Sequence, residues 1–248
     1  MTRDLYEDFA ERYDLAFGQF STHDPLAVEF FRKLFVANAV STVLDCACGT
    51  GRHLRLFYSL GCEVFGSDLS ESMLAQARKN MAECGTEVPL CQADYRDLPR
   101  YFQRQFDAVV CLGSIGYMPN EVERLRAFES MGQVLRHGGI LVLTAIPTDR
   151  QWKEKPRFML TANTRDFSRL FVIDYLEQTA RYTILDIFHS EEAKELKVWS
   201  AELSVTLRDD QERLLKASGF HTVDFYGAFD FAPYDKEVSN SLIAVARK

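Results

Sequence analysis

The residues of this chain with the clearest capacity for chemistry are two glycines and the carboxylates around them. Gly49 and Gly51 follow the strand-like segment 42–46 in the sequence TVLDCACGTG, and a helical pattern begins directly after them. Glycines leave the backbone bare because they have no Cβ, and the first N–H groups of the following helix point at whatever lies there. This spacing is typical of a site for a nucleotide-like ligand.

The acids in this half of the chain indicate which kind of ligand would bind. Asp45 precedes the glycines, Asp68 closes the next apolar run, and Asp94 follows the run after that. The dinucleotide fingerprint asks for a third glycine where this chain has Leu54. Carboxylates beyond consecutive parallel strands suit a ligand that is rich in hydroxyl and amine groups and has no phosphate to repel them. S-adenosylmethionine (SAM) fits that description.

Four segments of the sequence resemble, in order, motifs I to IV of class I SAM-dependent methyltransferases. They are DCACGTG at 45–51, GSDLSESML at 66–74, QADYRDL at 92–98 and FDAVVCLGSIGYM at 106–118. The resemblance covers residues 1–147 and resumes at 209–248. Its pattern is closest to small-molecule N-methyltransferases of the glycine/sarcosine type and to amino-sugar N-methyltransferases. It implies an enzyme that takes a methyl group from SAM and leaves S-adenosylhomocysteine.

A set of residues is expected to hold the cofactor. Asp68 would accept both ribose hydroxyls, in charge-assisted hydrogen bonds worth roughly 1.5–3 kcal/mol each. Leu69 and Met73 would contact the adenine, and Asp94 would accept from its exocyclic amine with Tyr95 alongside. The other residues expected at the cofactor are Tyr13, Asp45, Ala47, Gly49, Thr50, Gly51, Arg52 and Leu112.

The loop at 113–119 is where the methyl acceptor is expected, because its two glycines let a substrate approach the end of a parallel strand. Many amino-methylating relatives with other substrates carry Asn-Pro-Pro-Tyr here, whereas this chain has LGSI at 112–115. This difference argues against DNA or protein-glutamine methylation, and the SIGY form is similar to enzymes that methylate small amines. Glycine itself is not expected, since relatives specific for it carry an arginine where this chain has AIP at 145–147.

Four residues are candidates for contacting the acceptor during catalysis. Tyr13 lies in the sequence ERYD, which resembles the N-terminal segment of small-molecule N-methyltransferases and would close over the methionine end of SAM. Tyr117 belongs to the 113–119 loop. Asp230 and Tyr234 lie in GAFDFAPY at 227–234, and the tyrosine of this loop faces the acceptor in glycine-type relatives. Methyl transfer requires aligned reactants and no covalent enzyme intermediate, and the sequence has no competing metal, Ser-His-Asp or phosphate-loop pattern.

An α/β fold would position these residues. We expect a doubly wound, mostly parallel, seven-stranded Rossmann-like sheet with an antiparallel last strand. Its SAM-binding domain would comprise 1–147 and 207–248, with 1–40 as an N-terminal helical lid. Residues 148–206 would form an inserted, substrate-covering subdomain, because apolar and polar residues alternate in a period typical of antiparallel strands. The expected elements of the second half are a helix at 121–135, a strand at 140–146, roof strands at 169–175, 178–189 and 197–206, a helix at 211–218 capped by Asp209-Asp210, and a hairpin at 220–226 and 239–246.

Composition narrows the partners. The 248 residues carry a formal net charge of −7, and no basic run of the kind that follows a phosphate backbone is present, so nucleic acid is not expected as substrate. The charged N-terminal residues and the lack of a long apolar stretch predict a cytoplasmic protein without a membrane partner, as a monomer or homodimer. The alternatives are a small-molecule O- or C-methyltransferase, a non-catalytic SAM-binding protein and, weakened by Leu54, a nicotinamide oxidoreductase.

Overall fold

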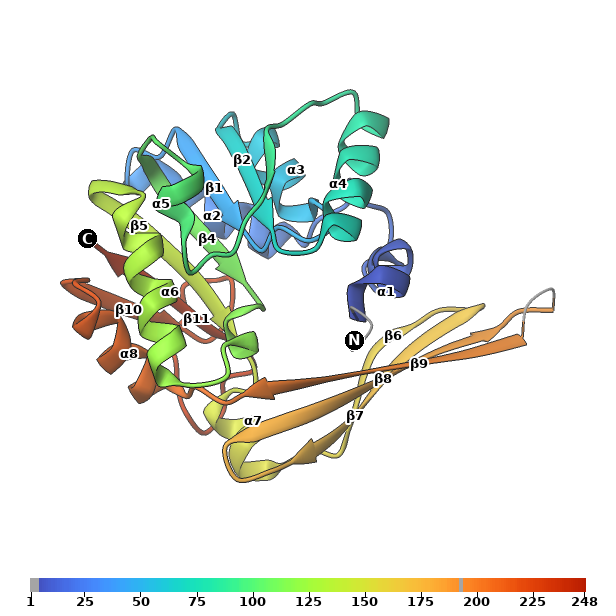
Figure 1. Cartoon of the computed structure of the whole chain (residues 1–248). Helices are drawn as coiled ribbons and strands as arrows, with labels where there is room; N and C mark the ends of the chain where they lie inside the picture. The colour runs from blue at the N-terminus through green and yellow to red at the C-terminus, as the bar shows by residue number, and fades with distance from the viewer. Residues whose placement is uncertain (1–4, 192–193) are drawn as a thin grey trace.

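The computed structural model describes residues 5–191 and 194–248, which form two separate β-sheets (Figure 1). The strands of the large sheet are β1 (Thr42–Cys46), β2 (Glu63–Asp68), β3 (Leu90–Gln92), β4 (Phe106–Leu112), β5 (Leu135–Ala145), β10 (Thr222–Tyr226) and β11 (Leu242–Arg247). The strands of the small sheet, here called the roof sheet, are β6 (Phe158–Asn163), β7 (Phe167–Tyr175), β8 (Thr179–His189) and β9 (Lys194–Ser204). The helices are α1 (Leu5–Tyr13), α2 (Pro25–Ala37), α3 (Arg52–Ser59), α4 (Glu71–Glu83), α5 (Leu98–Tyr101), α6 (Glu121–Gln133), α7 (Asp149–Glu154) and α8 (Arg208–Ala217).

The large sheet has the strand order β10-β11-β5-β4-β1-β2-β3. β1 pairs in parallel with β2 and β4, while β11 runs antiparallel to both β5 and β10. The predicted mostly parallel, seven-stranded sheet with an antiparallel last strand is therefore confirmed. The chain reverses its direction of winding at β1, and in such sheets ligands bind beyond the carboxyl ends of the strands beside the switch point.

Two hydrophobic cores cover the two faces of the large sheet. One packs α2, α3 and α4 onto it, through side chains such as Phe30, Leu54 and Leu74. The other packs α5, α6 and α8, through side chains such as Phe128 and Leu214. Each core contains fully buried large side chains, so the sheet is held from both sides and its strand ends are fixed in position.

The helices that lead to the strand ends begin at recognisable caps. The Asp24 carboxylate accepts a hydrogen bond from the backbone N–H of Leu26, and Pro25 occupies the first helical position of α2. The Ser70 hydroxyl accepts from the N–H of Met73 at the start of α4. The Ser70 cap directly follows the end of β2, so sequence and sheet topology agree on where this loop of the site lies.

The roof sheet is antiparallel throughout, in the order β6-β7-β8-β9. It extends below the large sheet in Figure 1, and α1 lies between it and α4. No helix of the described residues is long and apolar enough to cross a lipid bilayer.

Several expected boundaries differ from the structure. The roof has a fourth strand, β6, and a preceding helix, α7; α7 starts at a capping box formed by Thr148 and Gln151, which the sequence interpretation overlooked. β5 begins at Leu135 rather than at 140, because residue 135 already pairs with Phe106 of β4 before a shift in register between Phe106 and Ala108. α8 begins at Arg208, so Asp209 and Asp210 lie in its first turn and do not cap it. α6 ends at Gln133.

Candidate active site

The turn after β1 is bare backbone in an uncommon conformation. Ala47, Gly49 and Gly51 have positive φ angles of 66°, 53° and 88°. A Cβ on Gly51 would meet the Cβ of Ala77 at 3.3 Å, whereas one on Gly49 would have no atom within 4 Å. Gly51 therefore permits close helix packing, and Gly49 borders open space. A non-glycine residue with positive φ, such as Ala47, is held against its steric preference and is frequent at ligand sites.

The carboxylate of Asp68 is fixed beside this turn. One of its oxygens accepts from the backbone N–H of Gly49 and the other from that of Ser70, each at 2.9 Å. A carboxylate has about four acceptor positions, and these two backbone bonds orient it at the end of β2. Asp68 thus joins the ends of two neighbouring parallel strands.

Asp45, like Gly51, is an expected cofactor residue that does not line the cavity beyond the strand ends. It is 1% exposed, and of the described residues none hydrogen-bonds its Oδ2. Burial, together with the nearby negative charge of Asp68, raises the pKa of the Asp45 carboxyl well above its usual range. Asp45 therefore sits behind the glycine turn as a buried acid that keeps its proton to higher pH than an exposed aspartate does.

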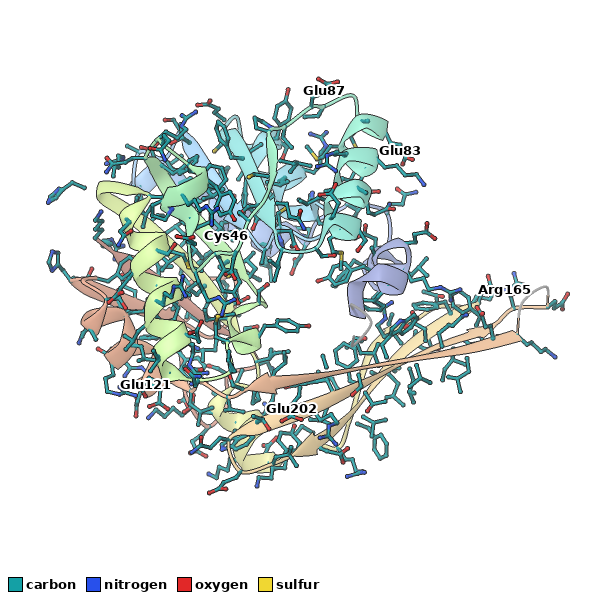
Figure 2. The ribbon with its side chains drawn as sticks, in the orientation of Figure 1. Cys46, Glu83, Glu87, Glu121, Arg165 and Glu202 are labelled. Carbon is teal, nitrogen blue, oxygen red and sulfur yellow. The ribbon has the colours of Figure 1, made fainter. Side chains whose placement is uncertain are left out.

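A cavity of about 820 Å³ opens beyond the carboxyl ends of β1, β2 and β4 and continues beneath the roof sheet. Its volume is in the upper part of the range for small-molecule sites. Figure 2 shows Cys46 within the large sheet above this region and Arg165 at the distant tip of the roof sheet. The end of the cavity at the large sheet, here called the cofactor end, is lined by Ala47, Gly49, Thr50, Arg52, Asp68, Leu69, Met73, Asp94, Tyr95 and Leu112.

Asp94 lines the cofactor end but has a partner that the sequence interpretation missed. Its two oxygens bind Arg96, whose guanidinium also bonds the carboxylate of Glu123 at 2.5 Å. Burial alone would raise the pKa of Asp94, yet the hydrogen bonds from Arg96 outweigh it and lower the pKa. Asp94 is thus held ionised and in place, and an adenine amine would have to share it with Arg96.

The segment after α1 is bound to the glycine turn. Asp14 accepts from the hydroxyl of Thr50 at 2.8 Å and from the side-chain amide of Asn80 at 2.9 Å. The guanidinium of Arg52 donates to backbone carbonyls of residues 17, 19 and 22 and lies 5.3 Å from the ring centre of Phe17. Thr50 and Arg52 therefore fasten the N-terminal segment over the cofactor end as well as lining it.

The other end of the cavity, here called the acceptor end, is bounded by α1, the loop after β4 and the roof sheet. It is lined by Phe9, Tyr13, Ser114, Tyr117, Met118, Pro119, Ile146, Met159, Thr161, Arg169, Phe171, Tyr182, Ile184, Ala201 and Leu203. Burial, and after it the influence of Tyr117, raises the pKa of Tyr13 to about 12. Both tyrosines line the cavity, and the Tyr13 hydroxyl keeps its proton at neutral pH.

A histidine also lines the cavity. His53, in the first turn of α3, has its pKa lowered to about 4, first by burial and then by the charges of His23 and Arg52. Its imidazole is therefore uncharged at neutral pH and is a weak base.

The 227–234 loop lies elsewhere. Tyr234 and Asp230 are absent from the described cavity lining. The Tyr234 hydroxyl donates to the Asp149 carboxylate at 2.7 Å and accepts from the Asp149 N–H at 2.9 Å. Asp230 accepts from the N–H of Ala232. The loop instead packs Phe231 on Phe30 of α2, with ring centres 4.4 Å apart, so the expected approach of Tyr234 and Asp230 to an acceptor is not seen.

Sequence reasoning also missed the most buried ion pair of the roof sheet. Arg169 on β7 faces Asp186 on β8, with Nε–Oδ1 at 2.6 Å and Nη2–Oδ2 at 2.8 Å. The same guanidinium donates to the carbonyls of Arg12 and Tyr13 at the end of α1. A charged residue on the apolar face of each of two strands was the available signal, because such residues are buried only when paired.

Comparisons with known proteins agree with this geometry. A family model described as a methyltransferase domain matches residues 43–139. The chain is 28% identical over 247 residues to a glycine/sarcosine N-methyltransferase from Aphanothece halophytica, covering 98% of this chain and 89% of the relative. It is 38% identical over 104 residues to a dTDP-3-amino-3,4,6-trideoxy-alpha-D-glucopyranose N,N-dimethyltransferase from Streptomyces venezuelae, covering 42% of this chain and 41% of that one.

Solved structures share the whole fold. A SAM-dependent methyltransferase from Clostridium acetobutylicum superposes with a TM-score of 0.82 at 18% identity, over 98% of this chain and 99% of that one. A SAM-bound amino pentose methyltransferase from Micromonospora echinaspora gives 0.73 at 20% identity, over 100% and 98%. At these identities the likeness concerns the fold. The matched methyltransferase domain, the sequence motifs and the relative aligned along nearly the whole chain together support a SAM-dependent methyltransferase.

Proposed function

We propose that this methyltransferase acts on the amine nitrogen of a small molecule. SAM supplies a methyl group activated by a sulfonium cation. The residues that fit it are the bare backbone at Gly49, the oriented carboxylate of Asp68 and the apolar side chain of Met73. Support for a small acceptor comes from the enclosed cavity and from the N-methyltransferase relatives.

The observation that favours nitrogen over oxygen is that the pKa values of Tyr13 and His53 suit neither residue to act as a base near pH 7. Among the described lining residues of the cavity, Tyr13 is a hydroxyl with a pKa of about 12, and His53 is neutral with a pKa of about 4. Neither is tuned to remove a proton near pH 7. An alcohol needs such a base, whereas a neutral amine already presents a lone pair. Tyr13 and Tyr117 can accept hydrogen bonds from the amine N–H groups and align them.

The enzyme's own contribution is then alignment and exclusion of water. The roof sheet, α1 and the segment held by Asp14 and Arg52 enclose the reacting centre. Holding two reactants in line can lower a barrier by roughly 7–11 kcal/mol. The proton of the methylated amine leaves to solvent after transfer, because neither Tyr13 nor His53 is tuned to accept it near pH 7.

The test measures transfer of tritiated methyl from SAM to phenethylamine, phenethyl alcohol and phenethyl thiol, which differ only in the acceptor atom. We expect label in the amine and a rate that rises with pH until the amine is neutral. Asp68→Ala is the cofactor-site variant and should strongly lower the signal at limiting SAM, while Asp97→Ala, a half-buried acid outside the described lining, should retain it. Faster transfer to the alcohol or thiol would contradict the proposal.

A further inference from the structure

The face of the roof sheet that lines the cavity is organised in rows across its strands. Met159 on β6, Phe171 on β7 and Ile184 on β8 are successive partners and form one apolar row. Tyr182 on β8 lies opposite Ala201 on β9 in the next row. All five line the cavity. These two rows therefore give the roof side of the acceptor end a largely apolar wall in which Tyr182 carries the one hydroxyl.

The row on the other side of Phe171 holds a charge that is already neutralised. Arg169 is 2% and Asp186 is 0% exposed. The guanidinium binds both carboxylate oxygens of Asp186, donates to two carbonyls at the end of α1 and lies 4.7 Å from the ring centre of Phe9. A buried ion pair of this kind presents no net charge to a ligand, and separating it is strongly unfavourable. Arg169 is thus a structural link between roof and α1, although it lines the cavity.

Resting on the proposed function, we propose that the acceptor end binds an amine carried on an apolar body and selects against a carboxylate beside the nitrogen. An ionised carboxylate against Met159, Phe171 and Ile184 would lose its hydration without gaining a partner. An apolar group at the same place is taken out of water favourably. The cationic form of an amine is also attracted to aromatic rings, and Phe9, Tyr13 and Phe171 are among the lining residues.

Ala201 shapes this wall. Its side chain is a single methyl group between the larger Tyr182 and the strand edge, so the wall is recessed there. Ser200, the preceding residue, is exposed and points to the opposite face of the same strand. The pair offers a matched test of the recess, because the same bulk can be added on the inner and on the outer face.

The first experiment uses four acceptors that differ in whether they carry an aromatic group and in whether they carry a carboxylate. They are methylamine, glycine, phenethylamine and phenylalanine; each amino acid differs from its amine only by the carboxylate. Values of kcat/KM at saturating SAM are divided by the fraction of neutral amine. We expect the aromatic body to raise kcat/KM by about tenfold or more and the carboxylate to lower it by at least about tenfold in both pairs.

If glycine or phenylalanine had a kcat/KM equal to that of the matching amine without the carboxylate, the proposal would be overturned, while N-methylation would stand. The absence of transfer to phenethylamine would also overturn it, as would preference for the polar body of glucosamine. Transfer to phenethyl alcohol in place of every amine would instead refute the proposed function, so the two failures are distinguishable.

The second experiment compares Ala201→Val and Ala201→Phe with Ser200→Phe. We expect KM for phenethylamine to rise in the order Ala, Val, Phe, reaching about tenfold or more for Phe, with unchanged SAM affinity as the sign of an intact fold. Ser200→Phe should behave as the parent chain. Equal KM values across the Ala201 series, or a larger effect from Ser200→Phe, would overturn the assignment.

Discussion

The two ends of the cavity are built in different ways. The cofactor end consists of backbone and loop residues at the ends of neighbouring parallel strands, where Gly49 and Asp68 meet through one short hydrogen bond. The acceptor end consists of side chains from an antiparallel sheet and an N-terminal helix, joined by the contact of Arg169 with the end of α1. The first is set by local chain geometry and the second by contacts between distant segments, so substrate selection can change without altering the cofactor turn.

The largest expected effect is a loss of stability at the acceptor end. Asp186→Ala leaves the buried guanidinium of Arg169 without its carboxylate and should lower the free energy of unfolding by about 3–5 kcal/mol. It should also release α1, because Arg169 donates to the carbonyls at the end of this helix. Trp199 can report the release, since its ring centre lies 4.9 Å from that of Phe9 on α1. Denaturant unfolding measures the first effect, and Trp199 emission in a Trp152→Phe background measures the second.

The matched control for this variant is Glu195→Ala. Glu195 on β9 accepts from Arg12 of α1 at 3.0 Å, so it joins the same two elements through a pair on the surface. We expect no measurable change in unfolding or in Trp199 emission, because exposed pairs contribute little. Equal destabilisation by both variants would show that the buried pair does not hold the roof to α1.

The second effect belongs to the cofactor end. Asp68→Ala removes the carboxylate expected at the ribose hydroxyls and should weaken SAM binding by roughly 2 kcal/mol or more, which is about 30-fold. Titration calorimetry with SAM measures it, and Asp97→Ala is the control. Unchanged affinity in Asp68→Ala would place the sugar elsewhere.

A pH dependence should follow from Asp45. Its raised pKa means that the folded chain holds this proton more tightly than the unfolded chain does. The stability that the carboxyl contributes is therefore present at low pH and is lost as pH rises from about 4 through the raised pKa. The free energy of unfolding of Asp45→Asn minus that of the parent chain should increase over that interval. A constant difference from pH 4 to pH 8 would contradict the burial of an unpartnered acid.

The smallest expected effects concern Tyr13 and Tyr234, which the sequence analysis both predicts to contact the acceptor. Tyr234→Phe loses hydrogen bonds to Asp149 and should reduce stability by about 1 kcal/mol without slowing methyl transfer. Tyr13→Phe should reduce kcat/KM about threefold to tenfold, the loss expected for one hydrogen bond. Steady-state kinetics on phenethylamine decides; a loss of activity confined to Tyr234→Phe would restore the role suggested by resemblance.

The cofactor end could be predicted from the sequence more fully than the acceptor end. Gly49, Asp68 and Met73 could be expected at one place because they lie at or shortly after the ends of recognisable strands, and parallel strand ends converge at one edge of a sheet; all three line the cavity. The oligomeric state and the cytoplasmic location stay predictions.

The acceptor end was harder to predict for a physical reason. A period of two shows which residues share a face of β7 and β8, but it does not show which face meets the cavity or that Arg169 and Asp186 pair across it. For Tyr234, the same aromatic loop can pack on a substrate or on α2, and the neighbouring Phe231 finds its partner in Phe30.

The most direct test of the central claim is a crystal structure with S-adenosylhomocysteine and phenethylamine. The account predicts the adenosine at the Gly49 turn with both ribose hydroxyls within hydrogen-bond distance of Asp68, and the phenyl ring against Phe171 and Ile184. An adenosine bound beneath the roof sheet, or a phenyl ring outside the cavity, would contradict it.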